Sequence, residues 1–204
     1  MSIQLYSHDI PSDLKLQGSL AVDTEATGLD LHRDRLCVVQ VADEAGTCVV
    51  VHFPLGESYQ CPHLKALLSD TTRRKIFHYA RFDLAMLEKY LGVWCEPVFC
   101  TKIASRLVRT YTERHGLKDL AKELLGVELS KTEQSTDWAK DKLTAAQVQY
   151  AANDVLYLHK VSTVLEQMLA REKRTALAND WFKGLRARVQ TDLMGWGNQD
   201  IFAH

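Results

Sequence analysis

Two acidic residues, Asp23 and Glu25, stand one position apart in the sequence, and their spacing could serve metal chemistry. They lie at the end of a segment, residues 20–25, that is typical of a strand. Because side chains alternate across a strand, both carboxylates would project from the same face. Two carboxylates on one face repel each other unless a cation lies between them. Taken alone, however, such a pair is more often the solvated end of a strand.

Three later residues add to this pair. Asp83 follows a predicted strand over residues 75–78 and lies in the first turn of a helix predicted over residues 82–91. An acidic residue there commonly interacts only with the helix dipole. Tyr150 and Asp154 are four residues apart on a helix predicted to begin at Ala145, so they share one face. A tyrosine beside an apolar stripe is more often a core residue.

The five residues together indicate phosphodiester hydrolysis. Four carboxylates can hold two divalent ions, and hard Mg²⁺ or Mn²⁺ prefers carboxylate oxygens. Such an ion pair can activate water and stabilise the attacking and leaving oxygens. Tyr150 would orient the water, because a phenol of pKa about 10 is a poor base at neutral pH.

In type, order and placement, the five residues resemble the DEDD exonucleases, in the tyrosine subclass that includes ribonuclease D and polymerase proofreading domains. Gln149 stands where the histidine subclass carries its histidine. The resemblance implies a ribonuclease H-like exonuclease fold and 3′→5′ exonuclease activity. It also implies that Asp23, Glu25, Asp83 and Asp154 bind the metal, with Tyr150 completing the catalytic set.

Other segments extend this resemblance over nearly the whole chain. The runs that resemble the ribonuclease D family are residues 32–40, 100–106, 115–120, 129–131 and 135–138. We expect none of the HRDC domains that follow the catalytic domain in ribonuclease D. Together with a Gly-Trp tail near Ile201, this most resembles the short nanoRNase C group. One departure is Tyr79, which stands where many family members carry Asn.

The nanoRNase C resemblance implies hydrolysis of very short single-stranded RNA, including linear dinucleotides such as pGpG, to nucleoside 5′-monophosphates. It also implies a ring-shaped homo-octamer. Two alternatives stay open. The same chemistry could act on longer RNA, such as tRNA 3′ ends, or on single-stranded DNA. The chain could also be an inactive RNA-binding or assembly module, although inactive members usually lose carboxylates.

Residues near the acids are candidates for substrate binding. Lys102, Arg106 and Arg109 have helical spacing and predict one basic stripe, although such stripes are more often solvated faces. Leu29, in the loop after Glu25, could wedge against a terminal base. Neither His78 nor His115 is needed as a base if a metal activates the water. The residues assigned to substrate binding are Thr24, Thr27, Gly28, Leu29, His78, Arg106, His115 and Lys118.

The expected architecture is an α/β fold with a mixed central sheet flanked by helices. Residues 20–25, 35–42 and 47–53 predict a three-strand antiparallel meander, and a strand–helix alternation that follows adds parallel strands. Beyond those already named, we predict a strand over residues 97–100 and helices over residues 62–68, 102–109, 117–125, 145–169 and 172–188. Thr144 and Gln147 form a capping box for the longest helix.

We expect residues 1–188 to form the exonuclease domain. Residues 189–204 form a tail whose Trp196, Ile201 and Phe202 favour packing between subunits.

Composition limits the class of protein. With 204 residues, 46% of them hydrophobic, the chain can form one well-buried domain. A net charge of −1 argues against sequence-blind coating of nucleic acid, but leaves room for a local site. The five cysteines form no close C-x-x-C pair and predict reduced core residues rather than a zinc site. Apolar runs are too short to span a membrane and no leader is visible, so we expect a cytoplasmic protein without membrane association.

Overall fold

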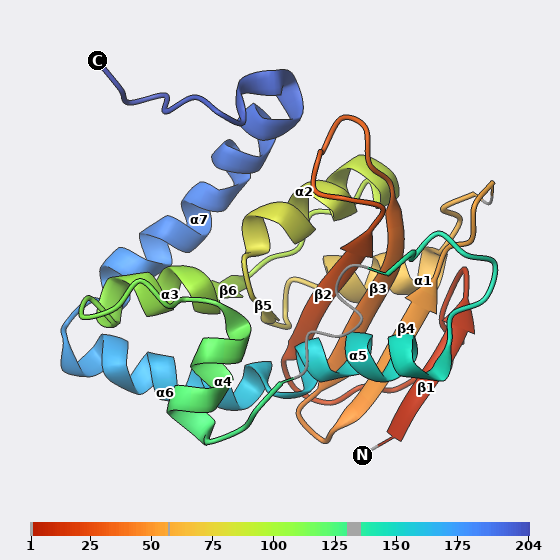
Figure 1. Ribbon diagram of the computed structural model, residues 1–204, viewed down its shortest axis with the longest axis horizontal. Coiled ribbons are helices and arrows are strands. Elements are labelled where there is room, and N and C mark those ends of the chain that lie inside the picture. The colour runs from red at the N-terminus through yellow and green to blue at the C-terminus, as the bar shows by residue number, and fades with distance from the viewer. Residues whose placement is uncertain (1, 57, 130–135) are drawn as a thin grey trace.

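The computed structural model describes residues 2–56, 58–129 and 136–204. A sheet with the strand order β1-β4-β3-β2-β5-β6 forms its centre (Figure 1). The strands are β1 (Ser2–Ser7), β2 (Leu20–Ala26), β3 (Leu36–Asp43), β4 (Thr47–His52), β5 (Lys75–Phe77) and β6 (Val98–Cys100).

The pairing of the strands confirms the predicted mixed sheet. β2, β3 and β4 form the antiparallel meander. β5 joins β2 in parallel, and β6 joins β5 in parallel. The sequence prediction omitted β1, which pairs in parallel with β4 at the edge of the sheet. Every residue of β1 is at least partly exposed, so its pattern lacks the continuous apolar run that marks the inner strands.

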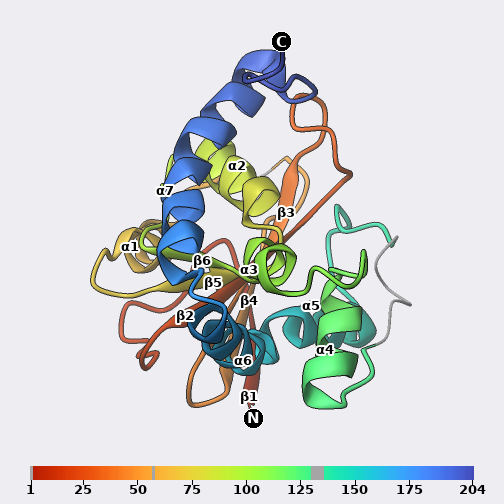
Figure 2. The same ribbon diagram turned by 90° about the vertical axis from the view of Figure 1, so that its left-hand side faces the viewer.

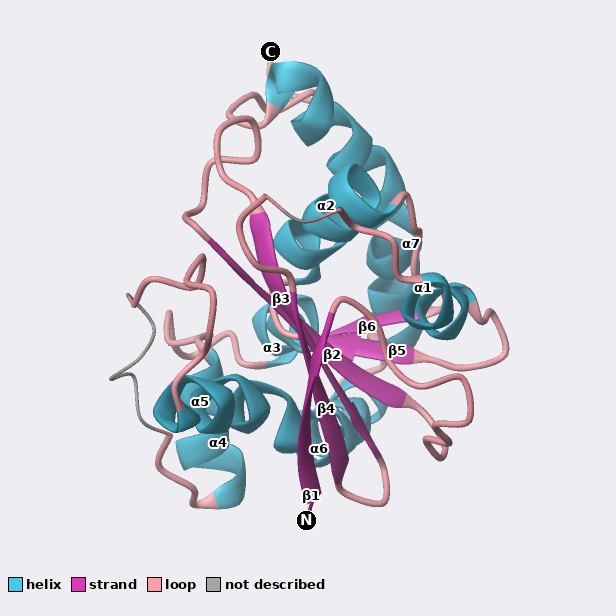
Figure 3. Cartoon of the chain, turned by 90° about the vertical axis from the view of Figure 1, so that its right-hand side faces the viewer, coloured by secondary structure: helices cyan, strands magenta, loops and turns pink. Residues whose placement is uncertain are grey.

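Helices cover both faces of the sheet. Figures 2 and 3 show α4 and α5 on one side and α1, α2 and α7 on the other. The helices are α1 (Pro62–Ser69), α2 (Ala80–Leu91), α3 (Thr101–Val108), α4 (Leu117–Leu125), α5 (Ala145–Leu156), α6 (Leu158–Arg171), α7 (Thr175–Thr191) and the short η1 (Asp192–Trp196). Because both faces are covered, every residue of β3 is buried.

The helix predicted over residues 145–169 is wrong in one respect, because it is two helices. The predicted capping box at Thr144 and Gln147 is present. The helix then breaks at Tyr157. α5 packs on β2, β3 and β4, whereas α6 packs on α3 and α4. Each half thus follows a different tertiary partner, which helical periodicity alone does not reveal.

Helix ends follow the local sequence more closely. Gly92 ends α2 in a left-handed conformation, with φ 66°, and its amide donates to the carbonyls of Glu88 and Leu87. Gly126 ends α4 in the same way, with φ 68°. Both stops match the prediction, because glycine adopts positive φ without a steric penalty.

The five cysteines are buried and unpaired, as predicted for core residues. Among the described residues, no helix combines the length and apolar character that crossing a membrane requires.

Candidate active site

Strand β2 directs two carboxylates toward α5. Asp23 and Glu25 lie on the face of β2 that α5 covers, and Asp154 projects from α5. One carboxylate oxygen from each of the three residues lies within 4.8 Å of the other two. All three side chains are half-buried. The sheet therefore gathers residues separated by about 130 positions into one acidic cluster, which we call the carboxylate triad.

Asp83 approaches the triad from the opposite face of β2. Thr24 alternates with Asp23 and Glu25, so its side chain points toward α2. Its backbone amide and its hydroxyl donate to Oδ1 of Asp83 at 3.1 and 2.7 Å. Thr24 was assigned to substrate binding from the sequence, but its hydroxyl binds Asp83 and holds that residue against β2.

Burial raises the pKa of all four carboxylates, and charge repulsion adds to the shift at Asp23, Glu25 and Asp83. Burial raises the pKa of Asp23 well above its ordinary range, and the charges of the other three carboxylates add to the shift. Burial likewise raises the pKa of Glu25, with contributions from Asp154 and Asp83. A site that resists ionisation in this way is one that a bound cation would stabilise.

The same effect acts on the two helix-borne acids. Burial raises the pKa of Asp83 to about 7, against the hydrogen bonds from Thr24. Burial also raises the pKa of Asp154 to about 7, opposed by a hydrogen bond from the Tyr150 hydroxyl. The pKa of Tyr150 is itself raised, first by burial and then by the charge of Asp154. Tyr150 therefore keeps its proton at neutral pH and acts as a donor.

Trp138 packs beside this tyrosine. It is buried, and its ring centroid lies 6.1 Å from that of Tyr150. The indole therefore limits where the phenol can move.

The sequence reasoning gave no role to Gln40, which lies in β3 directly opposite Asp23. Its Nε2 donates to Oδ2 of Asp23 at 3.2 Å, and the residue is fully buried. Its Oε1 has no hydrogen-bond partner among the described residues. The sequence does contain a sign of this role, which is a glutamine inside the apolar run of residues 36–42. A polar side chain buried in such a run requires a hydrogen-bond partner.

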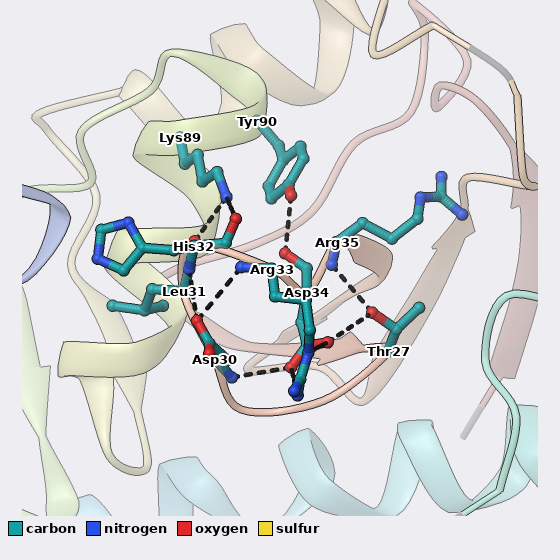
Figure 4. Close-up of polar contacts among 9 residues, drawn as sticks. All are labelled: Thr27, Asp30, Leu31, His32, Arg33, Asp34, Arg35, Lys89 and Tyr90. Atoms are coloured by element: carbon teal, nitrogen blue, oxygen red, sulfur yellow. Dashed lines mark hydrogen bonds and ion pairs between the residues drawn. The ribbon is translucent and has the colours of Figure 1, made fainter. Parts of the chain in front are cut away.

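Next to the triad, the loop of residues 27–34 is held by its own polar groups and by α2 (Figure 4). Asp30 accepts from two backbone amides that follow it in the loop. Asp34 accepts from the amide of Asp30 at 2.9 Å. From α2, Lys89 and Tyr90 donate to backbone carbonyls of the loop. The loop is therefore a defined structure rather than a loose connection.

This loop presents Leu29 to solvent, with 81% of the side chain exposed. The adjacent Gly28 has no space for a side chain, because a Cβ there would lie 2.3 Å from Oδ2 of Asp34. Thr27 accepts from the amide of Arg35 at 3.0 Å, so its hydroxyl also serves the loop. Of the three predicted substrate-binding residues here, Leu29 alone presents a side chain free of polar loop contacts.

The two histidines near the site are neutral. Nδ1 of His78 lies 2.9 Å from Oγ1 of Thr101, whose own proton goes to the carbonyl of Phe77. His78 therefore donates from Nδ1. Burial and then Lys102 lower its pKa to about 3. His115 is buried against Ser105 at 2.8 Å, and burial lowers its pKa. Neither histidine offers a positive charge to a phosphate.

The predicted basic stripe is wrong at Arg109. This residue follows the end of α3, so helical spacing no longer applies, and it is fully buried. It pairs with Glu123 and donates to Oγ of Ser105 at 3.0 Å.

The other basic residues remain available to solvent. Arg106 and Lys118 are exposed. Lys102 lies over the ring of Tyr79, with Nζ 4.1 Å from the centroid.

Comparison with known proteins gives this geometry a family. NrnC from Brucella melitensis, solved with bound Mg²⁺, is 50% identical, with a TM-score of 0.94 and full coverage of both chains. Its structure bound to pGG is 51% identical, with a TM-score of 0.94, and covers 100% of this chain and 99% of that chain. The resemblance to the nanoRNase C group is thereby confirmed.

More distant relatives have longer chains. DNA polymerase I from Aquifex aeolicus is 37% identical over 150 residues, which is 74% of this chain and 24% of that protein. Ribonuclease D from Sphingobium indicum is 33% identical over 170 residues, 83% of this chain and 42% of that protein. The chain thus spans well under half of these relatives. Residues 6–170 match the family described as 3′–5′ exonuclease, and the chain belongs to that family.

Proposed function

We propose that this protein is a metal-dependent 3′→5′ exoribonuclease that hydrolyses very short RNAs, including pGpG, to nucleoside 5′-monophosphates. The observation that carries the proposal is the carboxylate triad, in which three acidic oxygens lie within 4.8 Å of one another. Membership of the exonuclease family supports it, since residues 6–170 match. Full-length similarity to NrnC, solved with pGG and with Mg²⁺, supports the substrate and the cofactor.

The donor set fits hard divalent cations. Its members are carboxylates, and their mutual repulsion in a partly buried site favours a bound cation. Asp23, Glu25, Asp154 and Asp83 would hold two Mg²⁺ or Mn²⁺ ions. When bound, such ions lower the pKa of water and neutralise charge on the phosphate.

The chain's own residues have separate tasks. The raised pKa of Tyr150 keeps its hydroxyl protonated, so it orients the attacking water and does not remove a proton. Leu29, exposed on a loop anchored to α2, wedges against the terminal base. Arg106 and Lys118, which are both exposed, bind the phosphates of the substrate. We propose that the other five predicted residues support the structure of the site and do not bind the substrate through a positive charge. They are Thr24, Thr27, Gly28, His78 and His115.

The direct test uses Asp23→Asn, which removes one carboxylate charge with little change in shape. We expect hydrolysis of pGpG to fall to background in Mg²⁺, while circular dichroism stays that of the wild type. Asp141→Asn, at an exposed carboxylate outside the site, is the matched control and should keep full activity. Full activity of Asp23→Asn in saturating Mg²⁺ would end the proposal.

Substrate length needs its own experiment. We expect a dinucleotide to be hydrolysed faster than a twenty-nucleotide RNA or single-stranded DNA at equal concentration. A strong preference for the longer RNA would replace this proposal with ribonuclease D-like trimming. Calorimetry without substrate separates a third case, because an inactive RNA-binding module need not bind Mn²⁺.

A further inference from the structure

A buried carboxylate joins the C-terminal segment, residues 192–204, to helix α2. Asp192, the first residue of η1, is only 1% exposed. Arg81 of α2 donates to both of its oxygens, from Nε to Oδ2 and from Nη2 to Oδ1 at 2.8 Å. Nη2 of Arg188, one turn earlier on α7, lies 2.9 Å from Oδ1. One carboxylate therefore holds two guanidinium groups, a geometry that favours strong, directional contacts.

The chain after Asp192 returns to the same two arginines. Gly195 has φ 97°, a conformation that favours glycine and breaks the regular helix. The carbonyl of Gly197 then accepts from Nη2 of Arg81 at 2.7 Å and also from Arg188. The C-terminal segment is thus fixed to α2 within one protomer.

Arg81 occupies a sensitive position in α2. It is the second residue of the helix, two residues from Asp83 and two from Tyr79. Tyr79 has a left-handed backbone, with φ 69°, and its side chain makes no cap hydrogen bond. A tyrosine in this conformation is strained and persists only where its surroundings hold it. The first turn of α2 therefore depends on contacts from outside the helix.

A cavity of about 500 Å³ lies between this turn, the loop that carries Leu29, and the C-terminal segment. Leu29 and His32 line it from the loop, Tyr79 and Arg81 from α2, and Asp192 and Asn198 from the C-terminal segment. The C-terminal segment is thus a wall of the space next to the proposed wedge.

We propose that Asp192 is a positioning residue for the reaction. Through Arg81 it fixes the first turn of α2 and thereby the position of Asp83 relative to the carboxylate triad. Thr24 holds Asp83 against β2. The Arg81–Asp192 pair joins α2, the helix that carries Asp83, to the C-terminal segment. The inference rests on the proposed function, because it assigns Asp83 to metal binding.

The test compares Asp192→Asn, Arg81→Gln and the double variant with the wild type. Mn²⁺ binding is measured by calorimetry without substrate, and kcat and KM for pGpG are measured against Mg²⁺ concentration. We expect each single variant to bind Mn²⁺ about tenfold more weakly, as for other residues that orient metal ligands. If Asp192 acts through Arg81, the double variant should bind no more weakly than either single variant.

Asp180→Asn is the matched control, because it removes an exposed charge from α7, the helix that leads into Asp192. Its metal binding should equal that of the wild type. Light scattering of all variants checks that mass is unchanged. The proposal would be overturned by a lower unfolding free energy with unchanged Mn²⁺ affinity in Asp192→Asn. Additive losses of Mn²⁺ affinity in the double variant would also overturn it.

Arg81→Lys covers the case in which Asp192→Asn fails to fold. It keeps the positive charge but loses the bidentate contact with Asp192, so its Mn²⁺ affinity should still fall. An unchanged Mn²⁺ affinity would again refute the role of Asp192. A wild-type protein that neither binds Mn²⁺ nor hydrolyses pGpG would refute the proposed function instead. The two failures are therefore distinguishable.

Discussion

Asp23 lies where burial and three neighbouring carboxylates all oppose its ionisation. Burial raises the pKa of Asp154 and of Asp83 to about 7, and the charge of Asp154 adds to the shift at Asp83. Without a cation, the folded protein therefore carries an electrostatic cost concentrated in a few side chains. In the proposed function, this cost is what makes cation binding favourable.

The same cost predicts how the stability of the metal-free protein depends on pH. A carboxyl whose pKa is raised by folding stabilises the folded state below its unfolded pKa, near 3.8, and this stabilisation is lost as pH rises through about 7. Buried, neutral His78 acts in the opposite direction, since its pKa is lowered to about 3. The quantity to compare is therefore the difference between wild type and Asp154→Asn.

In EDTA, the unfolding free energy of Asp154→Asn minus that of the wild type should increase between pH 5 and pH 8. The expected increase is on the order of 3 kcal/mol. Urea unfolding at each pH measures the difference. Saturating Mg²⁺ should stabilise the wild type most at pH 8. Asp141→Asn should parallel the wild type throughout, and a flat difference for Asp154→Asn would contradict the electrostatic account.

Gln40 provides a second prediction at the scale of one residue. Gln40→Leu removes the donor to Asp23 but also removes a buried Oε1 that has no partner in the described structure, so stability should change little. We expect the Mg²⁺ concentration for half-maximal activity to rise about tenfold. The control is Val50→Ala, the buried register partner of Gln40 on β4. It should lower Tm and leave the Mg²⁺ requirement unchanged.

At the scale of elements, α2 supports three parts of the site. Its first turn carries Asp83, and its last turn holds the loop of residues 27–34 through Lys89 and Tyr90. Its start is fixed to the C-terminal segment by Arg81. A displacement of this helix would therefore move the acid, the loop and one wall of the adjoining cavity together.

Because the loop is anchored, Leu29 can be replaced without disturbing the fold. Its side chain is 81% exposed, so Leu29→Ala should change unfolding free energy by less than about 0.5 kcal/mol. If the leucine wedges against a base, KM for pGpG should rise severalfold. Leu55→Ala, another exposed loop leucine at 68%, is the control. Equal kinetics for both variants would exclude the wedge.

At the scale of the whole molecule, the C-terminal segment has both polar and apolar contacts to offer. It is bound to α2 through Asp192 and Gly197. It also presents an apolar face with large exposed side chains, including Met194 at 70% and Phe202 at 93%. Apolar groups gathered on one exposed segment are typical of an interface. We propose that this face packs between subunits of a homo-oligomer.

Phe202→Asp tests the interface and leaves in place the contacts of Asp192 and Gly197 with Arg81. We expect light scattering to give a smaller mass than for the wild type, because a charge in an apolar interface is costly to bury. Deleting residues after Leu193 should have the same effect, and it also removes the Gly197 contact. Leu5→Asp, at an apolar residue 47% exposed on β1, is the control. An unchanged mass for both tail variants would exclude this role.

The sequence by itself determined most of the elements, β1 excepted, and the choice of chemical groups. Side-chain alternation on β2 places Asp23 and Glu25 on one face, and helical spacing places Tyr150 and Asp154 together. Gly92 and Gly126 set helix ends through their own conformational freedom. These are local properties, so residue type and spacing suffice to predict them. The sequence also carried the family resemblance.

Tertiary structure decided what depends on distant partners. The break at Tyr157 follows from α5 and α6 packing on different surfaces. Arg109 turned inward because Glu123, fourteen residues away, offers it a carboxylate. The contacts of Gln40 with Asp23 and of Arg81 with Asp192 join residues that no periodicity relates. Their partners become neighbours only when the sheet and the C-terminal segment assemble, so spacing along the chain cannot reveal them.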